Sequence, residues 1–127
     1  MYELSKQFRF DSAHSLDRDI GEAKKQSSLR IHGHSYRSEI AVRGEIQPGS
    51  GMVIDLDALE QALGNLHQAL DHRMLNDIPD LGPPTMENLC HWIWDRLVIN
   101  FPNLVRVSVH RDSSGDSCVY YGKAPIS

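Results

Sequence analysis

The spacing of apolar residues along the chain changes between a period of two and a helical period, and this alternation predicts the fold. Apolar residues at every second position predict strands over residues 2–13, 34–46 and 104–110, and a shorter fourth strand is predicted over 117–121. After Asp55, leucines recur at spacings of three and four, which predicts an amphipathic helix with one leucine face.

A second helix is predicted over residues 86–100, because Thr85 is a good N-cap and apolar residues follow it at helical spacing. The segment 15–31 is polar and charged, so we expect a long loop, and such loops are often functional. The order strand, strand, helix, helix, strand, strand indicates an α+β fold. In it, a four-stranded antiparallel sheet carries two helices on one face.

The composition favours one soluble domain that spans residues 1–127, with 40% hydrophobic and 24% charged residues. No apolar run approaches the roughly 20 residues that span a bilayer, so no membrane association is expected. The start of the chain does not have the pattern of a secretory signal. A net charge of -4 argues against nucleic-acid binding, and only two cysteines favour the reducing cytoplasm.

The seven histidines are the unusual feature of the composition, and three of them suggest a metal site. In the run His32-Gly33-His34, an extended backbone turns both imidazoles to the same face. His14 ends the preceding strand, and a hairpin would place it opposite this pair. Three imidazoles with one open position are typical of a catalytic zinc site. The alternative is a solvated or accidental His-x-His pair on an edge strand.

Two further groups allow either a catalytic or a structural interpretation. Asp71 precedes His72 at the end of the first helix, and an Asp can orient an imidazole for acid–base catalysis. A histidine at a helix C-terminus also interacts favourably with the helix dipole, and the spacing alone favours this structural role. Thr85 and Glu87 similarly suit the start of any helix.

Five short motifs, taken together, carry a family resemblance that covers essentially the whole chain. They are Phe10-Asp11-Ser12-Ala13-His14, His32-Gly33-His34-Ser35-Tyr36, Gly51-Met52-Val53-Ile54-Asp55, Leu70-Asp71-His72 with Leu75-Asn76, and Pro84-Thr85 with Glu87-Asn88-Leu89. In their order and spacing the chain resembles the 6-pyruvoyltetrahydropterin synthase / 6-carboxytetrahydropterin synthase family. In its short length the chain most resembles the bacterial 6-carboxytetrahydropterin synthase branch, which belongs to the queuosine (deazapurine) pathway.

The resemblance implies the tunnelling fold, in which the sheets of three subunits join into a barrel and two trimers stack into a hexamer. It implies Zn²⁺ on His14, His32 and His34, and 7,8-dihydroneopterin triphosphate as the substrate. It further implies that Asp71 and His72 form a proton relay. Thr85 and Glu87 match family motif positions, which makes them candidate substrate-binding residues.

Two departures from the family pattern affect the candidate site. The reactive cysteine of the family is replaced by Ser28, a much weaker acid, so Asp19 and Glu22 are alternative bases. The glutamate that binds the pterin ring in the family is replaced by Arg111, which only donates hydrogen bonds. Asp112 is a candidate replacement, although a shift of one residue normally reverses the face of a strand.

Three hypotheses about function follow from these residues. The first is a zinc-dependent carbon–carbon or carbon–oxygen lyase that acts on the side chain of the dihydropterin, as in 6-carboxytetrahydropterin synthase. The second is a diverged enzyme of the same fold that keeps the metal and the relay but takes another substrate. The third is a non-catalytic homologue that binds metal or pterin.

Overall fold

The computed structural model describes residues 1–17 and 21–123, except for the side chains of residues 23, 24, 27 and 28. Its elements follow the predicted order, with one additional α-helix and one short 3-10 helix. The strands are β1 (Tyr2–His14), β2 (His32–Gly44), β3 (Leu104–Arg111) and β4 (Asp116–Tyr120). The helices are α1 (Glu22–Leu29), α2 (Leu56–Leu70), the 3-10 helix η1 (Leu75–Asp77) and α3 (Met86–Leu97).

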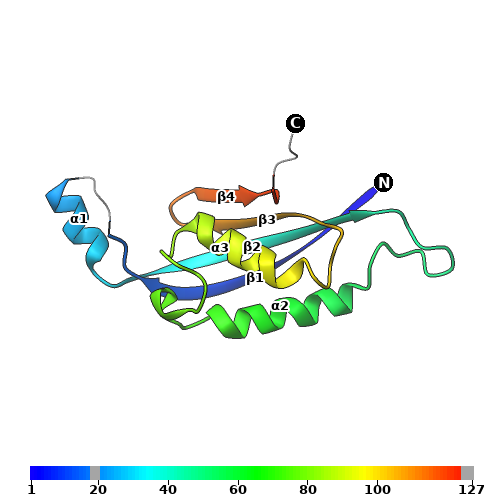
Figure 1. The fold of residues 1–127 in the computed structure, drawn as a ribbon, viewed down its shortest axis with the longest axis horizontal. Coiled ribbons are helices and arrows are strands. Elements are labelled where there is room, and N and C mark those ends of the chain that lie inside the picture. Colours follow the sequence, from blue (N-terminus) through cyan, green and yellow to red (C-terminus); the bar gives the residue numbers. More distant parts are fainter. Residues whose placement is uncertain (18–20, 124–127) are drawn as a thin grey trace.

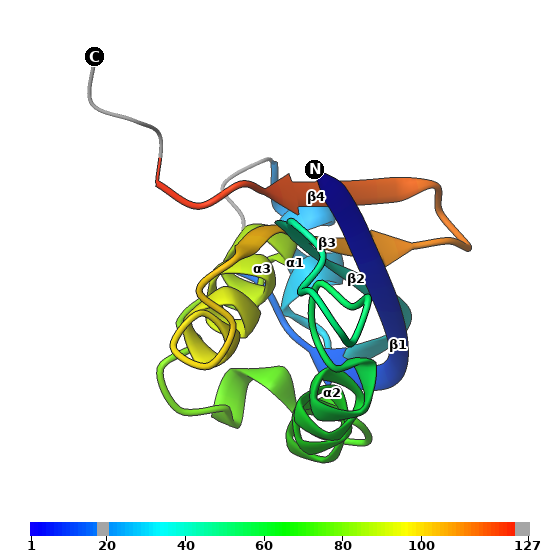
Figure 2. The same ribbon diagram turned by 90° about the vertical axis from the view of Figure 1, so that its right-hand side faces the viewer.

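The four strands form an antiparallel sheet in the order β1-β2-β3-β4, and α2 and α3 pack on one of its faces (Figures 1 and 2). This arrangement confirms the predicted α+β fold with two helices on one face. The longest pairing joins β1 and β2 from Tyr2↔Gly44 to His14↔His32. The register therefore places the end of β1 directly opposite the start of β2.

The core lies between the sheet and the two helices. The leucine face predicted from the sequence is buried on α2, and it packs with apolar residues of α3 and with the alternating apolar residues of the strands. Both predicted N-caps are made: Asp55 Oδ1 accepts from the Asp57 N–H at 2.9 Å, and Thr85 Oγ1 accepts from the Asn88 N–H at 3.1 Å. Each cap satisfies an otherwise unpaired N–H group of a helix start and fixes where that helix begins.

Helix α1 corrects one prediction, because it occupies residues 22–29 within the segment 15–31 that was expected to be a loop. The helix lies beyond the end of the sheet in Figure 1, and none of its described side chains belongs to the core. Its sequence has no apolar stripe, so a search for hydrophobic periodicity could not detect it. Local polar contacts accompany it instead, including a hydrogen bond from Gln26 Nε2 to Glu22 Oε1 at 2.9 Å.

The segment after α2 runs beside β1 and covers part of its free edge. The Ala13 N–H donates to the Arg73 carbonyl at 3.0 Å, and the His72 N–H donates to the Asp11 carbonyl at 2.7 Å. These bonds hold residues 71–74 against the strand end that carries His14. Among the described residues, no helix is long and apolar enough to cross a membrane.

Candidate metal centre

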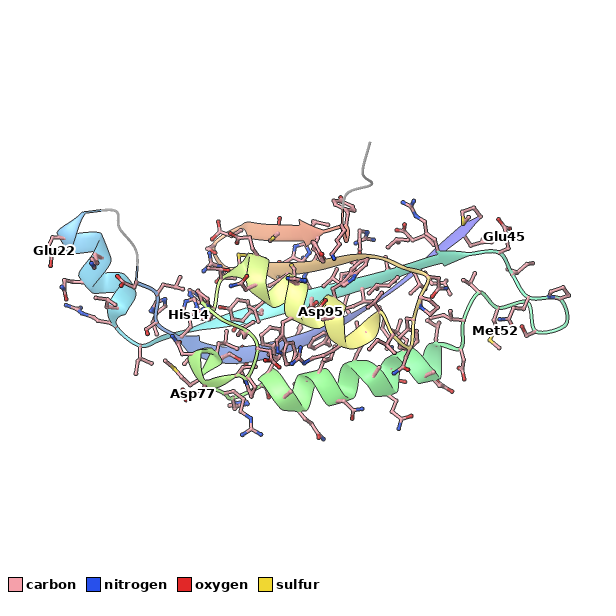
Figure 3. All side chains as sticks on the ribbon, in the orientation of Figure 1. His14, Glu22, Glu45, Met52, Asp77 and Asp95 are labelled. Carbon is pink, nitrogen blue, oxygen red and sulfur yellow. The ribbon has the colours of Figure 1, made fainter. Side chains whose placement is uncertain are left out.

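Three histidines meet where β1 ends and β2 begins. His14 is the last residue of β1 and pairs with His32, the first residue of β2, while His34 lies two residues further along β2 on the same face. In Figure 3, His14 lies at the end of the sheet nearest α1, far from the loop that carries Met52. The hairpin register therefore brings together the three residues that the sequence predicted to share a site.

The ring nitrogens of the three histidines converge on one point. His14 Nε2 lies 3.0 Å from His32 Nε2 and 3.0 Å from His34 Nε2. One ligand atom from each residue lies within 4.8 Å of the other two. His14 is 2% exposed, and His32 and His34 are half-buried, so the cluster is sheltered on the His14 side and more open on the other.

Backbone carbonyls determine the tautomers of two of these rings. The Pro84 carbonyl lies 3.0 Å from His14 Nδ1, and the Arg30 carbonyl lies 2.8 Å from His32 Nδ1. Because a carbonyl oxygen only accepts, each Nδ1 carries the proton and each Nε2 presents a lone pair. Two lone pairs that face each other at 3.0 Å repel, and a cation between them removes this repulsion. The donor set therefore fits Zn²⁺, which binds neutral imidazole nitrogen.

At neutral pH, protonation of these rings does not relieve the repulsion between the ring nitrogens in place of a metal. Burial lowers the pKa of His14, and the charges of His32 and Arg111 lower it further. Burial and the neighbouring His14 and Arg111 lower the pKa of His34 to about 4. Both rings are therefore neutral near pH 7, in the form that binds a metal.

The predicted dyad is held together at the end of α2. His72 Nδ1 donates to Asp71 Oδ2 at 2.7 Å, and Asp71 Oδ1 accepts from the Asp11 N–H at 2.8 Å. The Asp11 N–H, and after it the His72 ring, lowers the pKa of Asp71. His72 is 81% exposed and has a φ of 55°, a left-handed conformation uncommon for a residue other than glycine. This backbone geometry turns the chain so that the carboxylate and the imidazole meet.

His67 also contacts the dyad, and the sequence reasoning assigned it no role. Its Nδ1 donates to the Arg9 carbonyl at 2.8 Å, and its Nε2 lies 3.4 Å from Asp71 Oδ2. This contact could have been predicted from the sequence, because His67 and Asp71 are four residues apart at the end of a predicted helix and so lie on the same face.

The structure does not bring the dyad into contact with the three histidines of the same chain. No hydrogen bond joins them within the described ranges, but His72 and His34 both line a surface depression of about 600 Å³, together with Asp11, Ala13 and Ser35. Asp11 and Ala13 alternate along β1 with Ser12 and His14, which are buried on the helix side of the sheet. His72 therefore borders the same depression as His34, next to the side of β1 that carries Asp11 and Ala13.

The sequence also predicted that Thr85, Glu87, Glu22, Asp19 or Ser28 takes part in the site. Thr85 caps α3 directly after Pro84, whose carbonyl binds His14, and Glu87 follows in the first turn as an exposed residue. Glu22 is exposed on α1. Asp19 and the side chain of Ser28 lie outside the described residues.

Arg111 is the last residue of β3 and Asp112 the first residue after it, and their side chains point to opposite sides of the sheet. Asp112 accepts two hydrogen bonds from Arg37, each at 3.0 Å, and these lower the pKa of its carboxyl group. The structure therefore does not bring Asp112 to the histidines. Arg111 points to them instead, with its Nη1 3.4 Å from His34 Nε2.

The fold and the cluster together define a class of protein: a small α+β sheet protein whose three histidines form a candidate site for a divalent metal. The chain belongs to the 6-pyruvoyl tetrahydropterin synthase family, whose model matches residues 3–123. The resemblance noted from the sequence motifs is thereby confirmed.

Curated relatives of this chain carry several different names. A dihydroneopterin monophosphate aldolase of Pyrococcus furiosus is 36% identical over 77% of this chain and 76% of its own length. A 6-carboxy-5,6,7,8-tetrahydropterin synthase of Synechocystis is 34% identical over 76% of this chain and 75% of its own length. The human 6-pyruvoyl tetrahydrobiopterin synthase is 30% identical over 95% of this chain and 92% of its own length.

Solved structures confirm the fold. The 6-pyruvoyl tetrahydropterin synthase of Caenorhabditis elegans superposes with a TM-score of 0.81 at 24% identity, and the match covers 96% of each chain. The Plasmodium falciparum 6-pyruvoyl tetrahydropterin synthase gives a TM-score of 0.69 at 16% identity, covering 94% of this chain and 98% of that one.

Proposed function

We propose that this protein is a zinc-dependent lyase that acts on the side chain of a dihydropterin. The observation that carries the proposal is the convergence of three imidazole nitrogens on one point, with the Nε2 lone pairs of His14 and His32 left free by hydrogen bonds at Nδ1. In this proposal His14, His32 and His34 hold Zn²⁺. When bound, zinc supplies a Lewis acid that polarises carbonyl and hydroxyl oxygens of the substrate.

The particular reaction we propose is that of a 6-carboxytetrahydropterin synthase, with 7,8-dihydroneopterin triphosphate as substrate and a role in the queuosine pathway. The similarity to the Synechocystis protein of that name supports this choice. Asp71 and His72 are proposed as the proton relay, since the carboxylate fixes one ring nitrogen of His72 and leaves the other exposed to solvent. Ser28, Glu22 and Asp19 are the proposed alternatives for the base.

The remaining parts of the proposal concern the surroundings of the site. Thr85 and Glu87 are proposed to contact the substrate, because the start of α3 adjoins the metal site through Pro84. We further propose a cytoplasmic homo-oligomer, a hexamer of two stacked trimers. The two cysteines are free in the structure, in keeping with a reducing compartment.

The metal site is tested by replacing its ligands one at a time. We expect His32→Ala and His34→Ala to lose nearly all bound zinc, because two imidazoles alone hold the ion weakly. Metal analysis of the purified proteins measures the zinc content per chain. His91→Ala is the matched control, since His91 is exposed on α3, and it should keep a full complement. Full zinc occupancy in both ligand variants would contradict the proposal.

The reaction is tested by incubating the zinc-loaded protein with 7,8-dihydroneopterin triphosphate and measuring released acetaldehyde. Release of acetaldehyde supports the 6-carboxytetrahydropterin synthase activity. A second candidate, a diverged lyase with another substrate, is favoured by Arg111 at the position where the family has its pterin-binding glutamate. Zinc binding without either pterin binding or turnover would favour that candidate. Pterin binding without turnover would instead indicate a non-catalytic homologue.

A further inference from the structure

Arg111 places a fixed positive charge beside the three histidines. It is the last residue of β3 and continues the inward-facing row of Val107 and Val109, both fully buried. This position brings its Nη1 to 3.4 Å from His34 Nε2, and its side chain is 22% exposed. An arginine remains protonated at all physiological pH values, so the charge is permanent.

The β3–β4 hairpin fixes the orientation of the guanidinium group. Arg111 Nη2 donates to Asp116 Oδ2 at 2.8 Å, and the same carboxylate oxygen accepts from Ser114 Oγ at 2.9 Å. The turn is closed by the Gly115 N–H, which donates to the Arg111 carbonyl at 2.9 Å. One edge of the guanidinium is therefore held by the hairpin, while Nη1 faces His34.

The guanidinium also has a donor that nothing in the described part of the chain accepts. Arg111 Nε is buried and has no hydrogen-bond partner there. Buried N–H groups of this kind are nearly always paired, and leaving one unpaired is costly. Nε itself is enclosed, so an acceptor from outside the chain would meet the guanidinium at Nη1, which faces His34.

The chemistry of this position differs from that of the family glutamate. A glutamate accepts hydrogen bonds from the amino-pyrimidine edge of a pterin, whereas a guanidinium offers only donors. Planar guanidinium groups match the oxygen pairs of carboxylates and phosphates. A divalent metal on three neutral imidazoles adds two positive charges, and Asp116 is the acidic side chain in direct contact with Arg111. An anionic ligand group would offset this excess charge.

We propose that Arg111 determines substrate specificity by selecting molecules that carry a carboxylate or phosphate group beside the metal site. The inference deepens the proposed function and rests on it, since it requires a metal at His14, His32 and His34. Carboxylate and phosphate groups share the feature that Arg111 would recognise. Each presents at least two oxygens that carry negative charge and accept hydrogen bonds from a guanidinium.

The test uses protein loaded with Co²⁺, whose visible absorption spectrum reports ligands close to the metal. Inorganic phosphate and acetate are titrated separately against the wild type, Arg111→Met and Arg37→Met. We expect at least one anion to bind the wild type and to bind Arg111→Met about tenfold or more weakly, because a charge-assisted hydrogen bond is lost. Arg37→Met is the matched control, since Arg37 pairs with Asp112 on the opposite side of the sheet, and its affinity should stay within about twofold, as for a surface charge.

The outcomes separate this inference from the proposed function. A wild type that binds no Co²⁺ overturns both. A wild type that binds Co²⁺ but neither anion, or an Arg111→Met variant with full Co²⁺ content and wild-type anion affinity, overturns only the role of Arg111. A larger loss of affinity for phosphate than for acetate in Arg111→Met indicates selection of a phosphorylated substrate, and a larger loss for acetate indicates selection of a carboxylate. If Arg111→Met does not fold, Arg111→Lys is measured in its place. Lysine keeps the positive charge but lacks the planar pair of donors, so this variant should also bind the anion more weakly than the wild type.

Discussion

At the scale of single residues, the candidate metal site depends on the position of two protons. The carbonyls of Pro84 and Arg30 hold the Nδ1 protons of His14 and His32, which leaves both Nε2 lone pairs directed at one point. A histidine that donates from one nitrogen to a carbonyl is oriented for metal binding by the other. The contacts that orient these rings thus come from residues outside the His-x-His motif.

The lowered pKa values of His14 and His34 predict how the stability of the metal-free protein depends on pH. Between about pH 4 and 6.5 the unfolded chain binds more protons at these sites than the folded protein does. The free energy of unfolding should therefore fall as the pH falls through this window. We expect a loss of about 1–2 kcal/mol from pH 7 to 4.5, a figure reduced for the solvent screening of the part-exposed His34.

Denaturant unfolding of the metal-free protein at a series of pH values measures this dependence. His34→Gln removes one of the titrating groups and keeps a polar side chain of similar size, so its stability should vary less with pH over the same window. A slope for His34→Gln equal to that of the wild type would contradict the assignment of the effect to His34.

Ser28 provides a second prediction at this scale. If the chain performs the family chemistry, Ser28→Cys should raise the turnover of dihydroneopterin triphosphate at least about tenfold, because a thiol with a pKa near 8.5 gives up its proton far more readily than an alcohol. Acetaldehyde release at saturating substrate measures the rate. Ser28→Ala should change the rate little. Loss of a robust activity in Ser28→Ala would show instead that the serine itself is the base.

At the scale of elements, the contact between β4 and α3 depends on a glycine that follows the strand. Gly122 has a φ of +81°, and a Cβ at this position would lie 2.8 Å from Trp94 Cζ2. The tryptophan ring contacts the Tyr120 ring edge-on, with 5.2 Å between the centroids. A side chain at residue 122 would therefore push the end of β4 away from the helix that covers it.

We expect Gly122→Ala to lower the free energy of unfolding by about 1–3 kcal/mol, from the left-handed backbone and the clash with Trp94 together. Denaturant unfolding at pH 7 measures the change. Gly49→Ala is the control, because Gly49 also has a positive φ, of +94°, but a Cβ there would meet nothing within 4 Å. The difference between the two variants gives the cost of the clash, and equal losses would refute the packing role of Gly122.

At the scale of the whole molecule, the sheet ends in two edges, β1 and β4, and only part of the β1 edge is covered by residues 71–74. Unpaired edges favour association with another chain. Closing the edges between subunits would satisfy backbone groups along β1 and β4.

We therefore expect a trimer or a hexamer in solution. Light scattering at micromolar concentration measures the mass, which should be three or six times the 14.4 kDa of one chain. A stable monomer near 14.4 kDa would refute the prediction. A charged residue on the β4 edge, Val119→Lys, should lower the mass if this edge is paired, since Val119 is 40% exposed in the isolated chain.

The sequence by itself determined the order of the main elements, the leucine face of α2 and the two helix caps, because these depend on local periodicity and on hydrogen bonds within a few residues. It also predicted that His14 would join His32 and His34, since a hairpin brings the end of one strand to the start of the next. The polar helix α1 was not predictable from periodicity, because no apolar face marks it.

Only the tertiary structure decided which side chains surround the three histidines. The register of β2 and β3 turns Arg111 toward His34 and Asp112 toward Arg37, and that register is set by pairing across 62 to 73 residues of sequence. The tautomers depend equally on the approach of Pro84 to His14, a contact between the start of a helix and the end of a distant strand. Local sequence patterns carry no information about such approaches, because packing of the whole core fixes them.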